Sequence, residues 1–278
     1  MSAAVFVIVL FAAACHAVWN AIVKNAPDSQ AGAVLVAGCA GVISAIALPF
    51  VPVPAAASWP YLAAALVLHT VYYTLVGKAY RAADMSQAYP LMRGTAPLIV
   101  AVVTAFWLGE ALSVPAWAGV VLVSSGVLTT ALGVRRGDSF RGVALALLNA
   151  LVIAGYTIND GLGVRVAGSA AGYIMWLSLA ASVPLIAREI ISRPGYFRAY
   201  ATANLHLGLI GGAGTLVSYG LALWAMTQAP VAIVAALRET AIVFATGIAV
   251  FVLHEKVTPA RLAAIALIGL GTVALKLA

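Results

Sequence analysis

Charged residues are scarce in this sequence. Only 8% of its 278 residues are Asp, Glu, Lys or Arg, whereas 64% are hydrophobic. Soluble globular proteins carry roughly 25% charged and 45–50% apolar residues, so this chain has too few charges to cover a water-facing surface. With a mean hydropathy of +1.08, the composition predicts an integral membrane protein whose surroundings are the lipid bilayer.

Cysteines and carboxylates are scarce too. The two cysteines, Cys15 and Cys39, lie inside apolar runs and are too few for a metal or disulfide framework. No residues have the spacing of zinc ligands, and no two of the eight carboxylates lie within four residues of each other. We therefore expect no metal site, no cofactor and no catalytic centre, which leaves a membrane enzyme as a weak alternative.

Ten apolar stretches of about 17–25 residues are long enough to cross a bilayer. They lie near residues 3–23, 31–50, 60–80, 84–108, 114–133, 142–163, 170–190, 203–227, 230–253 and 258–277. The first has no basic region before it and no cleavage site after it, so it is interpreted as a span and not as a signal peptide.

The basic residues indicate the orientation. Of the 15 Lys and Arg residues, eleven fall in the odd-numbered connections, and the even-numbered connections and termini carry only Arg165 and Lys276. Because cytoplasmic loops are enriched in Lys and Arg, both termini are predicted to lie outside a bacterial inner membrane. The same distribution explains the net charge of +7 without nucleic acid as a partner.

The two halves of the chain resemble each other. At an offset of 145 residues, Arg93 matches Arg238, Thr95 matches Thr240 and Glu110 matches Glu255. The sequence thus predicts two five-span repeats, 1–137 and 138–278. Because five is odd, the second repeat enters the membrane from the opposite side, and such inverted repeats are typical of transporters that alternate access around a midplane site.

The ends of these halves carry a recognisable motif. It comprises Ala-Pro-Leu at 96–98, Leu-Gly-Glu-Ala-Leu-Ser at 108–113 and Trp-Ala-Gly at 117–119, and the second half keeps Glu255 and Thr258 but has His254 in place of the glycine. On these residues the chain resembles the drug/metabolite transporter superfamily, in its EamA-type ten-span branch. The resemblance implies a secondary transporter that exports small metabolites, and its nearest type is the YddG-type exporters of neutral and aromatic amino acids.

Arg93 and Arg238 are the foremost candidates for substrate contact. Each lies about nine residues into its span, or ~13 Å at 1.5 Å per residue, which is close to the middle of a ~30 Å hydrocarbon layer. An arginine at that depth must face protein, water or a partner. Either the two guanidiniums bind a carboxylate or phosphate of the substrate, or they have a structural role, in which they bond free carbonyls of broken helices or pair with Glu239 or Asp160.

Two prolines flank Arg93. Pro90 and Pro97, with Gly94 between them, should interrupt or kink the fourth span and provide a hinge. Glu239 is predicted near the midplane, where it either couples transport to protons or serves as a structural partner. Asp160 is predicted near the outer interface, where a solvated helix end is the favoured interpretation.

Aromatic and amide groups complete the predicted site. His16, Trp19 and Asn20 share one face of the first span, and further aromatic residues follow in later spans, of which Tyr156 and Tyr219 are the strongest candidates. The resemblance implies that spans one, three, four, six, eight and nine surround the cavity. His69 is expected to be a core histidine with a satisfied hydrogen bond.

The sequence therefore predicts an all-α transporter that binds a small molecule such as an amino acid in a central cavity, with a monomer as one option for its working state. Multidrug and nucleotide-sugar transporters share the superfamily pattern and stay open as alternatives.

Overall fold

A computed structural model describes residues 1–24, 26–131, 140–251, 254 and 258–278. The predictions that concern Arg135, Arg136, Glu255 and Lys256, and the repeat boundary at 137/138, lie outside the described residues.

Within the described ranges the chain consists of helices and connecting turns, without a strand. The α-helices are α1 (Ala3–Lys24), α2 (Ser29–Ala47), α3 (Trp59–Ala82), α4 (Met85–Trp107), α5 (Val114–Thr129), α6 (Phe140–Val166), α7 (Ala170–Ser192), α8 (Pro194–Met226), α9 (Val231–Arg238), α10 (Ala241–Phe251) and α11 (Pro259–Leu277). Two short 3-10 turns, Leu48–Phe50 and Ala56–Ser58, lie between α2 and α3.

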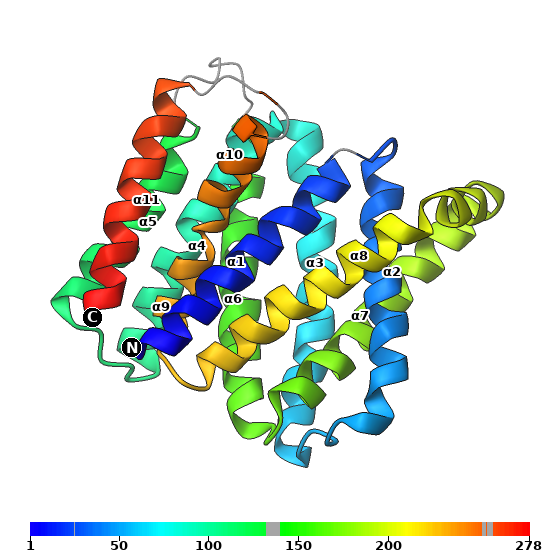
Figure 1. Cartoon of the computed structure of the whole chain (residues 1–278), viewed down its shortest axis with the longest axis horizontal. Helices are drawn as coiled ribbons and strands as arrows, with labels where there is room; N and C mark the ends of the chain where they lie inside the picture. The colour runs from blue at the N-terminus through cyan, green and yellow to red at the C-terminus, as the bar shows by residue number, and fades with distance from the viewer. Residues whose placement is uncertain (25, 132–139, 252–253, 255–257) are drawn as a thin grey trace.

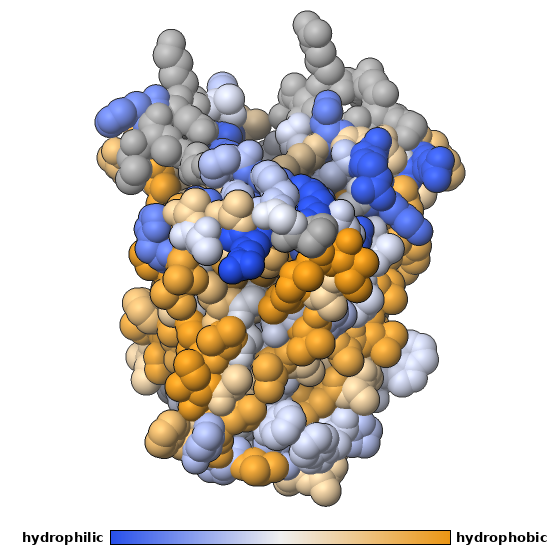
Figure 2. Space-filling model, turned by 90° about the vertical axis from the view of Figure 1, so that its right-hand side faces the viewer, coloured by the Kyte–Doolittle hydropathy of each residue, from blue (hydrophilic) through white to orange (hydrophobic). Residues whose placement is uncertain are grey.

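The helices are long enough to form the predicted spans. In the described part of the chain nine helical segments are long and apolar enough to cross a membrane, with α9 and α10 together forming one segment, and α5 is a shorter apolar helix of 16 residues. Figure 2 shows the expected hydrophobic belt, with strongly hydrophilic residues gathered towards one end. The two termini lie together at the opposite end (Figure 1).

Side-chain caps set several helix starts. Asp28, Ser113, Ser169 and Thr258 each accept a hydrogen bond from the backbone N–H three residues later, at the beginning of α2, α5, α7 and α11. These bonds satisfy donors that a helix N-terminus leaves unpaired. The short connections between spans are therefore specified locally.

The ninth span is divided into two helices and α8 is kinked at Asn204, whereas the fourth span, for which the prolines predicted an interruption or a kink, is a single helix. Helix α4 continues through Pro90 and Pro97. In the ninth span, α9 ends at Arg238 and α10 begins at Ala241, with Glu239 as the C-terminal cap of α9. Neither Gly nor Pro occurs at this break. Helix α4 is not interrupted at Pro90–Pro97, while the alternative of a kink there, and the hinge role, stay predictions.

Close helix pairs organise the bundle. Helix α5 packs on α11 through Gly119, Gly126 and Gly271, where an added Cβ would lie within 3 Å of the facing helix. Helix α8 packs on α2 through Gly208 and Gly212, which have the GxxxG spacing that lets helix backbones approach closely. Helix α1 packs on α8, and α3 packs on α6. Two related halves would produce this pattern, because the first helix of each half then contacts the third helix of the other. The repeat itself stays a prediction.

Candidate functional site

A cavity of about 180 Å³ lies at the centre of the bundle. All seven predicted substrate-binding residues line this cavity. They are His16, Trp19 and Asn20 on α1, Arg93 on α4, Tyr156 on α6, Tyr219 on α8 and Arg238, the last residue of α9. Tertiary packing thus brings the seven predicted substrate-binding residues to one cavity.

The wall has two contributors that the six-span expectation omitted. Helix α2 supplies Ala37 and Ala40, and α7 supplies apolar residues together with Ser178 and Ser182. Their small or aliphatic side chains carry no pattern that separates a cavity wall from ordinary helix packing, so sequence reasoning could not have found them.

A second cavity, of about 270 Å³, adjoins the first. Both are lined by His16, Asn20 and Tyr89, and the second extends to Lys24, at the end of α1, and to Arg261, near the beginning of α11. These helix ends border odd-numbered connections, which the positive-inside rule places in the cytoplasm. The two cavities therefore lead from the centre of the bundle towards the predicted cytoplasmic side.

Arg93 forms a buried ion pair with Glu239. The guanidinium Nη2 lies 2.7 Å from Oε1 of the carboxylate, and Nε donates to Oε2 at 3.1 Å. Both side chains are about nine-tenths buried. This arrangement corresponds to the structural alternative for both residues, because it neutralises a charge that would otherwise be costly inside a membrane.

Arg238 differs from Arg93 although the two occupy matching positions in the halves. None of the described residues forms a hydrogen bond or ion pair with its guanidinium, which lies 4.9 Å from the ring centre of Tyr219 in a cation–π contact. The residue is 9% exposed and lines the central cavity. Its charge is therefore available to an anionic group in the cavity.

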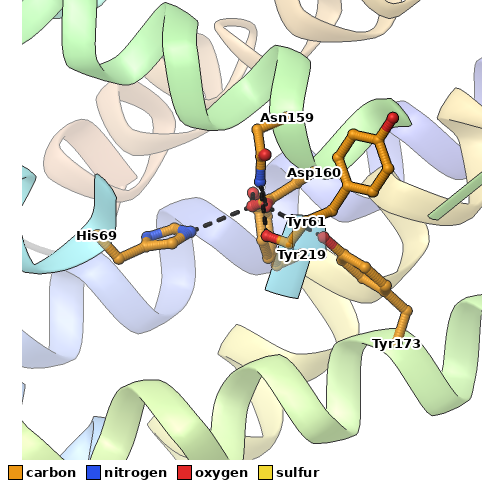
Figure 3. Close-up of polar contacts among 6 residues, drawn as sticks. All are labelled: Tyr61, His69, Asn159, Asp160, Tyr173 and Tyr219. Atoms are coloured by element: carbon orange, nitrogen blue, oxygen red, sulfur yellow. Dashed lines mark hydrogen bonds and ion pairs between the residues drawn. The ribbon is translucent and has the colours of Figure 1, made fainter. Parts of the chain in front are cut away.

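Asp160 is fully buried and accepts several hydrogen bonds (Figure 3). The hydroxyl of Tyr219 donates to Oδ2 at 2.5 Å, and Oδ1 receives the hydroxyl of Tyr173 at 3.3 Å and the amide of Asn159 at 3.1 Å. The Nε2 atom of His69 lies 3.1 Å from Oδ2.

The favoured interpretation of Asp160 as a solvated helix end was wrong. Helix α6 continues to Val166, so Asp160 lies more than one turn inside it. Helices α3, α7 and α8 cover the carboxylate with His69, Tyr173 and Tyr219. The sequence offered no signal for this cluster, because its members are distributed over four helices.

Aromatic rings form much of the remaining wall. His69 lies on the cavity and stacks on Tyr156 with ring centres 4.5 Å apart, and Tyr72 packs against Tyr156 edge to face at 5.6 Å. On the α1 side, His16 and Trp19 pack edge to face at 5.1 Å. His69 thus has the hydrogen-bond partner expected of a core histidine, but it also faces the cavity. A wall of this kind suits a small molecule with an apolar or aromatic part.

A second ion pair lies at the predicted outer end. Glu110, between α4 and α5, binds Arg165 of α6 at 2.7 Å and accepts the backbone N–H of Val231, the first residue of α9, at 3.0 Å. Arg165 also donates to the carbonyls of Met226 and Ala229. These contacts tie the first half of the chain to α6, α8 and α9, on the side away from the second cavity.

Comparisons with known proteins agree with this architecture. Residues 140–277 match the model of the EamA-like transporter family. No curated protein matches the chain. Among solved structures, 27 chains match. One of them, a crystal structure of a protein, is 19% identical to this chain. The match covers 98% of this chain and 95% of the other chain, with a TM-score of 0.72. At that identity the likeness shows a shared fold.

Proposed function

From the membership of residues 140–277 in the EamA-like transporter family, a family of transporters and not of enzymes, we propose that this chain exports small carboxylate-bearing metabolites across a bacterial inner membrane. Neutral and aromatic amino acids, the substrates of YddG-type exporters, are the first candidates. The observation that supports this proposal is the unpaired guanidinium of Arg238 in an aromatic-lined cavity.

The difference between the two arginines supports an anionic group on the substrate. Because Glu239 neutralises Arg93, Arg238 is the cation that a ligand can bind without displacing a protein carboxylate. A carboxylate would match its planar fork of donors. The rings of Tyr156 and Trp19, which line the same cavity, would then contact the side chain of an amino acid.

The route to the cavity supports export. The second cavity connects the site to the predicted cytoplasmic side, while Glu110 and Arg165 join the halves at the other end. A substrate would enter from the cytoplasm, and opening towards the outside would require those contacts to separate. We propose that Pro90, Gly94 and Pro97 in α4 and the break after Arg238 allow this rearrangement.

The superfamily alternatives differ in what they require of Arg238. A cationic drug would be repelled by an unpaired guanidinium in a low-dielectric cavity. A nucleotide sugar would satisfy the arginine through its phosphates. It would also need room for a base, a ribose and a sugar, so it would have to extend from the central cavity of about 180 Å³ into the adjoining one of about 270 Å³.

Uptake into proteoliposomes tests the proposal. The panel comprises labelled phenylalanine, leucine and lysine, a cationic dye and a nucleotide sugar. We expect saturable transport of phenylalanine and leucine that Arg238→Ala reduces at least tenfold. Removal of Arg238 orphans no carboxylate in the described structure, so the variant should stay folded. Arg188→Ala, which removes an exposed arginine of α7, is the matched control. Transport of the dye, or full activity of Arg238→Ala, would contradict the proposal.

A further inference from the structure

His69 has one ring nitrogen in use and one available. Its Nε2 atom contacts Asp160, and none of the described residues bonds to Nδ1. The side chain is 17% exposed and forms part of the cavity wall. In the neutral ring one nitrogen donates and the other accepts, so Nε2–H donates to Asp160 and Nδ1 is the acceptor for a proton that enters through the cavity.

Asp160 is arranged to stabilise the imidazolium that would result. Its carboxylate is the acceptor for Asn159, Tyr173 and Tyr219 as well as for His69. Ionised carboxylates only accept hydrogen bonds, so this set of donors matches the charged form. A proton on His69 would therefore form beside a fixed negative charge, as in the histidine–aspartate pairs of hydrolases.

The other side chains that contact this pair are tyrosines: Tyr156 on α6, Tyr173 on α7 and Tyr219 on α8. Arg93, Arg238 and Glu239 are the charged groups that act on Tyr156, and the guanidinium of Arg238 also lies over the ring of Tyr219.

His16 on α1 is the second histidine of the cavity, and its surroundings differ. The charges that act on it are those of Arg93 and Arg238, and no described carboxylate contacts its ring. A proton on His16 would add a third positive charge beside two guanidiniums, whereas a proton on His69 has a counterion. The geometry thus selects His69.

The fixed charges of the cavity balance when His69 is neutral. Arg93 is paired with Glu239. Arg238 has no direct partner among the described residues, but its positive charge and the negative charge of Asp160 cancel in the sum. Tyr219 lies between the two, with its hydroxyl bound to the carboxylate and its ring under the guanidinium. A bound anion would leave one surplus negative charge, which is costly in a low-dielectric site. A proton on His69 would remove that surplus.

We propose that His69, supported by Asp160, is a proton-binding site that fills when the cavity binds an anion and stays empty when it binds a zwitterion. The inference rests on the proposed carboxylate contact at Arg238. Anions would then bind together with one proton, whereas neutral amino acids, which bring no net charge, would bind without one. Linkage makes the effect reciprocal, so protonation of His69 also strengthens anion binding.

Phenylpropionate and L-phenylalanine provide a matched pair of probes, because they differ only in the ammonium group. Binding is measured by calorimetry on the full chain in detergent at pH 7.5, in two buffers with different heats of ionisation, which yields the protons taken up per ligand. We expect about one proton with phenylpropionate and about none with phenylalanine. Anion affinity should fall about tenfold per unit of pH above 7.5, as uptake of one proton requires.

Variants assign the proton to its site. His69→Gln retains a donor for Asp160, so it should fold, still bind phenylalanine and take up no proton with either probe. His206→Gln, which changes an exposed histidine of α8 outside the cavity, should keep the uptake with phenylpropionate. Binding of phenylpropionate without a proton, or uptake that persists in His69→Gln, would overturn the inference and leave the proposed function standing. Failure of both probes to bind would overturn the carboxylate contact itself.

Discussion

Arg93 and Glu239 lie 146 positions apart in the sequence, yet their charged groups meet at 2.7 Å in the middle of the bundle. The pair joins α4 of the first half to the break between α9 and α10 of the second. Because Arg238 is adjacent to Glu239 in the chain, the same pair also fixes the position of the unpaired arginine.

Breaking this ion pair should be costly. We expect Arg93→Ala to lower the free energy of unfolding by about 3–5 kcal/mol, because it leaves the carboxylate of Glu239 buried without a counterion. The double variant Arg93→Met/Glu239→Gln, which removes both charges, should recover much of that loss. Thermal unfolding in detergent measures both, and equal destabilisation by the single and double variants would contradict the explanation.

Glu239→Gln separates the two roles proposed for that residue. If Glu239 is a structural partner, the variant should be less stable but should keep whatever dependence on a pH gradient the wild type shows. If Glu239 couples transport to protons, a folded variant should lose that dependence. Flux in proteoliposomes with and without a pH gradient distinguishes the outcomes, and the ion pair with Arg93 makes the first our expectation.

The Glu110–Arg165 contact should hold the outer end closed. Glu110→Gln removes the charge from hydrogen bonds to Arg165 and to the N-terminus of α9, each worth ~1.5–3 kcal/mol, and should raise the population of the outward-open state. The readout is the rate at which a membrane-impermeant maleimide labels Ala229→Cys in a Cys15→Ala/Cys39→Ala background. We expect at least tenfold faster labelling, while Lys276→Gln, a charge removal at the C-terminus, should have no effect.

Gly94 marks a close approach of α4 to α5. A Cβ at this position would lie 2.7 Å from Cγ of Leu128, so Gly94→Ala should destabilise the protein by ~1–3 kcal/mol through overpacking. Gly269→Ala is the control, because nothing lies within 4 Å of its added Cβ. Recovery of stability in Gly94→Ala/Leu128→Ala would assign the loss to this contact. Reduced transport in that recovered variant would support the hinge proposal.

The capping residue of α2 should make stability depend on acidic pH. The N–H of Ala31 donates to Asp28, and with Arg193 and Tyr196 it lowers the pKa of this carboxyl below its usual value. Such a group stabilises the folded state above its unfolded pKa and loses the effect as the pH falls through the lower folded pKa. We expect Asp28→Asn, which can still cap, to reduce the loss of thermal stability below about pH 4. An unchanged acid profile would contradict this role.

The candidate site was largely predictable because membrane burial makes ionisable residues conspicuous. Arg93, Arg238 and Glu239 lie in apolar runs where each charge needs a partner, water or a cavity. The sequence could therefore indicate that the two arginines face the cavity and that Glu239 lies near them. The pairing did not follow. Arg93 and Arg238 occupy matching positions, so the sequence could not show which of them pairs with Glu239. The structure pairs Glu239 with Arg93.

Asp160 and His69 illustrate what sequence could not supply. Each is an isolated polar residue in a long apolar helix, and depth along the helix says little about which neighbours cover it. Their 3.1 Å contact depends on the packing of α3 against α6.

Hydrophobic runs and glycine positions determined the helical membrane fold and its close-packed glycine contacts, because these follow from local composition and from the need to satisfy backbone groups in lipid. Basic loops predict the orientation of that fold. The tertiary structure alone decided which arginine is neutralised, where a span is broken and which carboxylate is enclosed. Those outcomes depend on contacts between helices far apart in the chain, where several pairings satisfy the same local rules.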